Sequence, residues 1–109
     1  DGDERTGWVV FYLHIAEEGR VQVGDVLKQG DPVGYPSCEG GRSTGTHVHL
    51  ARKYNGQWIP AASPVLPFNL SGWIPVDGES PYEGWLVRGN DTVRASVLSD
   101  AESMVPAEE

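Results

Sequence analysis

The stretch that decides the fold occupies residues 46–60, and it contains Thr46-His47-Val48-His49-Leu50-Ala51-Arg52-Lys53-Tyr54-Asn55-Gly56-Gln57-Trp58-Ile59-Pro60. Residues 46–54 predict one β-strand, Asn55-Gly56 is a strong signal for a two-residue hairpin turn, and residues 57–60 are the expected return strand. Side chains two residues apart on a strand share a face, with Cα atoms roughly 6.5 Å apart. His47 and His49 are therefore expected to project together, either as polar residues on a solvated face or as a site for metal binding and proton transfer.

Strand signals also dominate the sequence on both sides of this hairpin. Gly and Pro are plentiful, at 14 and 8 residues, and no segment carries an apolar stripe of helical length. The sequence predicts a turn at residues 1–7, a strand at 8–15, two short strands separated by Gly-Asp turns within 21–34, a strand at 68–75, and a terminal hairpin of residues 82–87 and 92–97. The expected fold class is all-β: a Gly-rich antiparallel sheet or barrel-sandwich of the duplicated hybrid type, with a small C-terminal β-hairpin extension.

Length, charge and cysteine content restrict the possible functions. The chain has 109 residues, enough for a small domain with a single core, and its net charge is −8. Such an acidic chain is a poor candidate for binding nucleic acid or anionic membranes, and no run is long enough to span a membrane. The one cysteine, Cys38, cannot form an intrachain disulfide. Cys38 lies in the loop before His47 and His49. Its possible roles are to pack within this loop, to bind a metal or to act as a nucleophile.

Several short motifs occur in a fixed order along the first half of the chain. Tyr12-Leu13-His14 is followed by Val21-Gln22-Val23-Gly24-Asp25, then by Gly30-Asp31-Pro32-Val33-Gly34, and then by Ser43-Thr44-Gly45-Thr46-His47-Val48-His49-Leu50. Over residues 8–60 this ordered set resembles the C-terminal part of the lysostaphin-type zinc endopeptidase domain. The resemblance implies that residues 1–66 are part of such a domain. The strand signals after it indicate a β-hairpin extension at residues 67–98, and residues 99–109 are expected to form an acidic tail that is poorly ordered or a short helix.

The resemblance also implies roles for individual residues. His49 would be a zinc ligand. His14 and His47 would be catalytic, serving as general base and transition-state stabiliser beside a metal-bound water. Ser43, Thr44 and Thr46 would shape the substrate-binding cleft. The substrates implied are peptides of bacterial cell-wall peptidoglycan, the cofactor is zinc, and the expected location is extracytoplasmic.

This sequence departs from the family pattern at the metal site. The other two zinc ligands of the family lie in a His-x-x-x-Asp motif upstream of Tyr-x-His, and no such motif precedes His14 here. A catalytic zinc site needs three protein ligands, so one histidine is not enough. Two explanations stay open. Either the chain is part of a longer peptidase, or it is a degenerate relative that binds cell wall or activates a partner. If the chain is part of a longer peptidase without its N-terminal strands, an open sheet edge is expected, which the missing segment or another copy would cover.

A barrel-sandwich carrier of a lipoyl or biotinyl group is a further alternative for the Gly-Asp repeats. Such a carrier displays its lysine at a hairpin tip. Lys28 lies instead within the Gly-Asp repeat.

Overall fold

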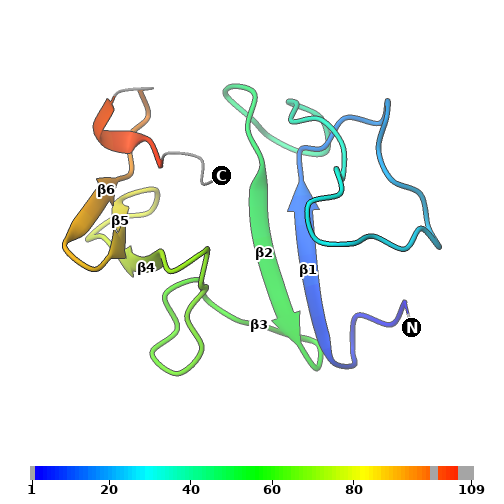
Figure 1. Ribbon diagram of the computed structural model, residues 1–109, viewed down its shortest axis with the longest axis horizontal. Helices are drawn as coiled ribbons and strands as arrows, with labels where there is room; N and C mark the ends of the chain where they lie inside the picture. Colours follow the sequence, from blue (N-terminus) through cyan, green and yellow to red (C-terminus); the bar gives the residue numbers. More distant parts are fainter. Residues whose placement is uncertain (1, 99–100, 106–109) are drawn as a thin grey trace. The chain divides into compact units, whose positions relative to one another are not determined.

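The computed structural model describes residues 2–98 and 101–105, and the chain divides into two compact units, Asp1–Trp58 and Ile59–Glu109. Each unit contains one three-stranded antiparallel sheet (Figure 1). The all-β prediction is therefore confirmed, and the strands of the described residues form no closed barrel. A search of the described residues finds no helix with the length and apolarity needed to cross a membrane.

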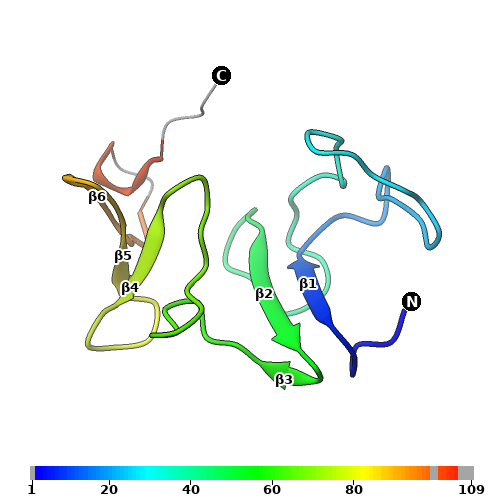
Figure 2. The ribbon, with the colours of Figure 1, turned by 60° about the horizontal axis from the view of Figure 1, so that its bottom comes forward.

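The sheet of the first unit is built on the predicted hairpin. Its strands are β1 (Trp8–Leu13), β2 (His49–Tyr54) and β3 (Gln57–Trp58), in the spatial order β1-β2-β3 (Figure 2). Asn55 and Gly56 have φ angles of 47° and 79°, and two successive positive φ values suit a tight hairpin turn between twisted strands. The hairpin prediction is confirmed, although the return strand ends at Trp58 instead of Pro60.

The two strands predicted within residues 21–34 are wrong, because this segment is a loop with two side-chain-closed turns. Oδ2 of Asp25 accepts the N–H of Gln22 at 2.8 Å, and Oδ2 of Asp31 accepts the N–H of Lys28 at 2.8 Å. Such local bonds compete with a strand ladder for the same donors. Val23 is fully exposed, so there is also no packed face to hold a strand in place.

The hydrophobic core is shallow in both units. Among the described residues, Ile15 in the first unit and Trp73 in the second are the hydrophobic side chains that reach the buried class, at 8% and 4% exposure. The first unit packs around Ile15 by means of Gly34, where an added Cβ would lie 2.5 Å from Cγ2 of Ile15. A core of this size leaves much of the apolar surface of the sheets in contact with solvent.

The second unit consists of β4 (Ile74–Asp77), β5 (Gly84–Arg88) and β6 (Asp91–Arg94), in that spatial order. The predicted terminal hairpin is confirmed, because β5 and β6 pair antiparallel, with Arg88 opposite Asp91. The strand predicted at 68–75 is wrong in its first half. Leu70 and Trp73 exchange two main-chain hydrogen bonds of 3.0 and 3.1 Å across a turn at Ser71-Gly72, and β4 begins only after it.

The predicted acidic tail, residues 99–109, is described only in part. Ala101–Ser103 forms a single 3₁₀ turn, η1. Residues 99–100 and 106–109 lie outside the described residues, so the rest of the tail prediction is untested.

Candidate histidine site

His14 sits at the point where β1 ends and the chain turns. It has a φ of 65° and is 7% exposed, a combination that a non-glycine residue adopts only when its surroundings hold it there. Its carbonyl oxygen accepts hydrogen bonds from the N–H of Ser37 at 2.7 Å and from the Ser37 hydroxyl at 3.0 Å. Its ring nitrogen Nδ1 lies 2.8 Å from the carbonyl oxygen of Glu39. The segment around Ser37 therefore fixes both the main chain and the ring of His14.

His47 is held by the glycine-rich loop that precedes it. Its Nδ1 lies 2.8 Å from the carbonyl oxygen of Gly45 and 3.2 Å from the hydroxyl oxygen of Ser43. The Ser43 hydroxyl itself donates to Gly45 O at 2.6 Å. An isolated β-bridge pairs His47 with Ser37, the residue that also binds the main chain of His14. The two histidines are thus attached to the same short segment.

These contacts determine which ring nitrogen carries the proton in each neutral imidazole. A main-chain carbonyl oxygen can only accept a hydrogen bond, so Nδ1 of His14 and Nδ1 of His47 must each carry hydrogen. The lone pair of each neutral ring is then on Nε2. In both rings, Nε2 is therefore the nitrogen that can accept a proton or bind a metal.

His49 completes the cluster as the first residue of β2, opposite Leu13 of β1. The ring centroids of His14 and His47 are 4.5 Å apart, and those of His14 and His49 are 6.3 Å apart with nearly parallel rings. Within the part of the chain that the structure describes, no hydrogen bond fixes the His49 ring. The structure thus brings the three histidines, which are separated by up to 35 residues in sequence, into one cluster.

The donor set of this cluster is too small for a metal site on its own. Among residues 2–98 and 101–105, no three His, Cys, Asp or Glu side chains are grouped so that they could hold a metal ion. Catalytic zinc requires three protein ligands and an open position. The described residues alone therefore do not fit zinc, and any metal at this place would need ligands from elsewhere.

The remaining residues singled out in the sequence surround the cluster unequally. Ser43 contacts His47, whereas the side chains of Thr44 and Thr46 are exposed and make no hydrogen bond within the described residues. Cys38 is an exposed free thiol. The roles of Ser43, Thr44 and Thr46 in substrate binding stay predictions.

The sequence did not reveal the groups that orient the histidines. The carbonyl oxygens of Glu39 and Gly45 could come from any residue type, so residue identity carries no signal for them. The Glu39 carboxylate also has a structural part, since it accepts the N–H of Glu17 at 2.8 Å and ties its loop to the segment after His14. Two serine hydroxyls also take part: Ser37 donates to His14 O, and Ser43 lies 3.2 Å from Nδ1 of His47. The sequence motifs single out Ser43 but not Ser37.

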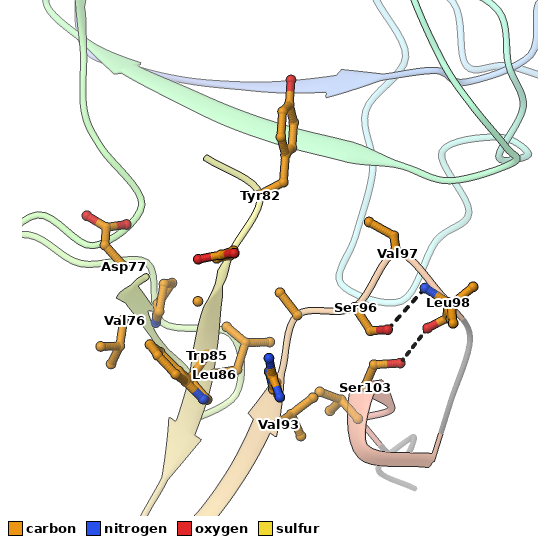
Figure 3. A pocket seen from close by; sticks show the side chains of 16 residues that line it. Val76, Asp77, Tyr82, Trp85, Leu86, Val93, Ser96, Val97, Leu98 and Ser103 are labelled. Carbon is orange, nitrogen blue, oxygen red and sulfur yellow. Dashed lines mark hydrogen bonds between the residues drawn. The ribbon is translucent and has the colours of Figure 1, made fainter. Parts of the chain in front are cut away.

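The second unit has its own surface hollow, which holds no histidine (Figure 3). Apolar side chains from β4, β5, β6 and the segment after β6 line it, among them Val76, Trp85, Leu86, Val93 and Leu98. Two hydrogen bonds shape one wall, from Leu98 N–H to the Ser96 hydroxyl at 3.0 Å and from the Ser103 hydroxyl to Leu98 O at 3.4 Å. The lining also carries the ionisable side chains of Asp77, Glu83 and Arg94, and no group of three side chains that could hold a metal ion occurs among the described residues.

Comparisons of the sequence and the structure with known proteins identify no relative. No protein-family model, no curated protein and no solved structure matches the chain. Any functional conclusion therefore rests on the histidine cluster and on the ordered sequence motifs around it.

Proposed function

We propose that this chain is part of a zinc-dependent endopeptidase that cleaves peptide bonds in bacterial cell-wall peptidoglycan, and that it acts outside the cytoplasm. The observation that supports the proposal most strongly is that three histidines converge. The ring centroids of His47 and His49 lie 4.5 and 6.3 Å from that of His14. The ordered motifs that end in Ser43-Thr44-Gly45-Thr46-His47-Val48-His49 resemble the lysostaphin-type family, and they supply the substrate class and the metal.

In this proposal the residues of the chain have separate tasks. Nε2 of His47 and Nε2 of His14 would each carry the lone pair that takes part in the reaction, because Nδ1 of each ring is hydrogen-bonded to a carbonyl oxygen. One ring takes a proton from the attacking water, and the other, once protonated, donates a hydrogen bond to the oxyanion. His49, which has no such hydrogen bond within the described residues, is free to serve as a metal ligand.

The zinc would lower the pKa of bound water and polarise the scissile carbonyl. Because the described residues provide too few ligands, the proposal requires two more from a His-x-x-x-Asp motif in a segment encoded upstream of Asp1. That motif is part of the hypothesis and can be looked for directly in the gene.

The decisive experiment uses the protein expressed from its own initiation codon. We expect stoichiometric zinc by elemental analysis and release of new amino groups from purified peptidoglycan. His49→Ala is expected to lose both zinc and cleavage, whereas His47→Ala and His14→Ala are expected to lose cleavage and largely keep zinc. Tyr82→Phe, at an exposed position in the second unit, is the control and is expected to keep both. If the wild-type protein takes up no zinc and cleaves no peptidoglycan, the endopeptidase proposal is lost.

A second candidate function, peptidoglycan binding without cleavage, has one observation in its favour. No group of three metal-ligating side chains occurs among the described residues. The same experiment separates the two functions. Sedimentation with insoluble peptidoglycan, without zinc and without product release, would establish the binding module.

A further inference from the structure

We propose that Lys53 of β2 binds a carboxylate group of the peptide substrate, on the same sheet face as the histidine cluster, and so determines which peptides the cluster receives. The proposal rests on the proposed function, because it places the peptide along the face that leads to the histidines. It adds a specificity-determining residue and an anionic group that the substrate must carry.

His49 and Lys53 lie on the same face of the first sheet. They are four positions apart in β2, and side chains at every second position of a strand share a face. Directly paired residues of the neighbouring strands extend this face, since Leu13 lies opposite His49 and Trp58 lies opposite Lys53. Four strand positions span roughly 13 Å, about the length of four extended peptide residues. A peptide held at the histidines can therefore reach Lys53 along this face.

The Lys53 ammonium group is held against the sheet instead of projecting freely into solvent. Its Nζ lies 4.5 Å from the centroid of the Trp58 ring and 5.5 Å from that of the Phe11 ring, and the lysine side chain is only 14% exposed. The faces of aromatic rings attract ammonium groups at such distances. Lys53 therefore presents its positive charge at a defined position on the face.

Glu4 shows that a carboxylate fits beside this ammonium group. Its Oε2 lies 3.4 Å from Nζ of Lys53, which is longer than the ~2.7–2.9 Å of a tight hydrogen bond between such groups. The Glu4 side chain is 58% exposed, and an exposed ion pair contributes little stability. An ammonium group has three hydrogen-bond donors. A substrate carboxylate can therefore join Glu4 at Lys53 or replace it there at small cost.

The charge of the chain makes this position selective. A net charge of −8 repels anionic peptides in general. Among the residues of β1, β2 and β3 that share the face of His49, Lys53 is the one with a permanent positive charge. Arg52 lies on the opposite face, where its guanidinium is 5.6 Å from the centroid of the Trp8 ring. An anionic group of the substrate is thus favoured at one end of the face.

A binding experiment tests recognition separately from cleavage. The protein expressed from its own initiation codon carries His47→Ala, so that the peptide is not consumed. Isothermal titration calorimetry compares a synthetic peptidoglycan stem peptide that has a free C-terminal carboxylate with the same peptide as its C-terminal amide. We expect the acid form to bind about five- to tenfold more tightly. Lys53→Gln should abolish this preference, and Lys53→Arg should retain most of it. Lys28→Gln, at an exposed position of another loop, is the matched control and should keep the preference.

Glu4→Gln distinguishes substrate recognition from a purely structural ion pair. Removing the competing carboxylate should tighten binding of the acid form about two- to fivefold, opposite in sign to the effect of Lys53→Gln. If the two variants weaken binding of the acid form alike, Lys53 only anchors Glu4 and the proposal is overturned. Equal affinity for the two peptides, or no binding of either, also overturns it.

Failure of this proposal can be told apart from failure of the endopeptidase proposal. A protein that binds zinc and cleaves peptidoglycan, but binds the two peptides equally, contradicts the role of Lys53 alone. A preference for the acid form that depends on Lys53, in a protein with neither zinc nor cleavage, supports the role of Lys53 and refutes the endopeptidase activity.

Discussion

Replacing Gly34 by alanine should destabilise the first unit more than the same change at Gly30 or Gly45. Gly34 has a φ of 147°, and an added Cβ would lie 2.5 Å from Cγ2 of Ile15 and 3.3 Å from Cα of Arg20. The strained backbone costs on the order of 1–3 kcal/mol, and forcing a methyl group into a packed site costs a further ~1–3 kcal/mol. We expect Gly34→Ala to lower the free energy of unfolding by about 2–6 kcal/mol, because the added methyl group would contact both the Ile15 side chain and the main chain of Arg20.

The two other glycines isolate the two contributions. Gly30 has a φ of 91° with nothing within 4 Å of the added Cβ, so Gly30→Ala tests backbone strain alone. Gly45 has open space and no positive φ, so Gly45→Ala tests the substitution itself. Unfolding by urea, followed by circular dichroism, measures all three variants.

The order of stability decides whether the packing account is right. We expect Gly45→Ala to be the most stable variant, Gly30→Ala intermediate and Gly34→Ala the least stable. Ile15→Ala should also lose part of its effect in the Gly34→Ala background, since the smaller side chain removes the overlap. The reasoning is refuted if Gly34→Ala is as stable as Gly30→Ala.

The remaining predictions concern the turn before β1, the hairpin turn and the loop before His47. The guanidinium of Arg5 contacts both carboxylate oxygens of Asp3, at 2.9 and 3.0 Å, and this bond and that of the Arg5 N–H hold the pKa of Asp3 below its usual value. The stabilisation from this contact is therefore present above the usual pKa of an aspartate and is lost as the pH falls through the lowered pKa of Asp3. Arg5→Gln should raise the pKa of Asp3, as measured by NMR titration. An unchanged pKa of Asp3 in this variant would contradict the account. Asn55→Ala should lower the free energy of unfolding in urea by about 1–3 kcal/mol, because it removes the 2.8 Å hydrogen bond from the Gly7 N–H and places alanine at a φ of 47°. Asn55→Gly should lower this free energy less, because glycine adopts a positive φ readily. Equal losses in the two variants would show that the backbone conformation is unimportant. Ser43→Ala should leave Nδ1 of His47 protonated, because Gly45 O still accepts its hydrogen at 2.8 Å, and nitrogen NMR showing hydrogen on Nε2 instead would contradict this.

The parts of the fold that could be predicted from sequence are those with local signals. Asn55-Gly56 suits two successive positive φ values, so the hairpin was predictable from two residues. The aromatic and β-branched run of residues 8–13 likewise predicted β1. The Val-rich segment at residues 21–34 misled, because its Gly-Asp turns are closed by aspartate side chains and no face of it is buried. The Ser71-Gly72 turn is a local signal that was missed, with φ values of 54° and 90°.

The sequence motifs single out His14, His47 and His49, and the structure places their rings close together. The orientation of these rings could not be predicted from the sequence. The bonds that orient two of the rings come from the main-chain carbonyls of Glu39 and Gly45, which residue identity does not reveal. Ser37 binds the main chain of His14 and pairs with His47, although it lies 23 residues after His14 in the sequence. This contact depends on how the loop between them closes, which the sequence does not reveal.

The most direct test of the histidine site is the protonation state of its ring nitrogens. Long-range ¹H–¹⁵N NMR on the labelled chain, at alkaline pH where the imidazoles are neutral, distinguishes Nδ1 from Nε2. The geometry predicts that His14 and His47 both carry hydrogen on Nδ1 and leave Nε2 unprotonated. Hydrogen on Nε2 of either neutral ring would contradict the account, because Nδ1 of that ring could then not donate to the carbonyl oxygen of Glu39 or Gly45.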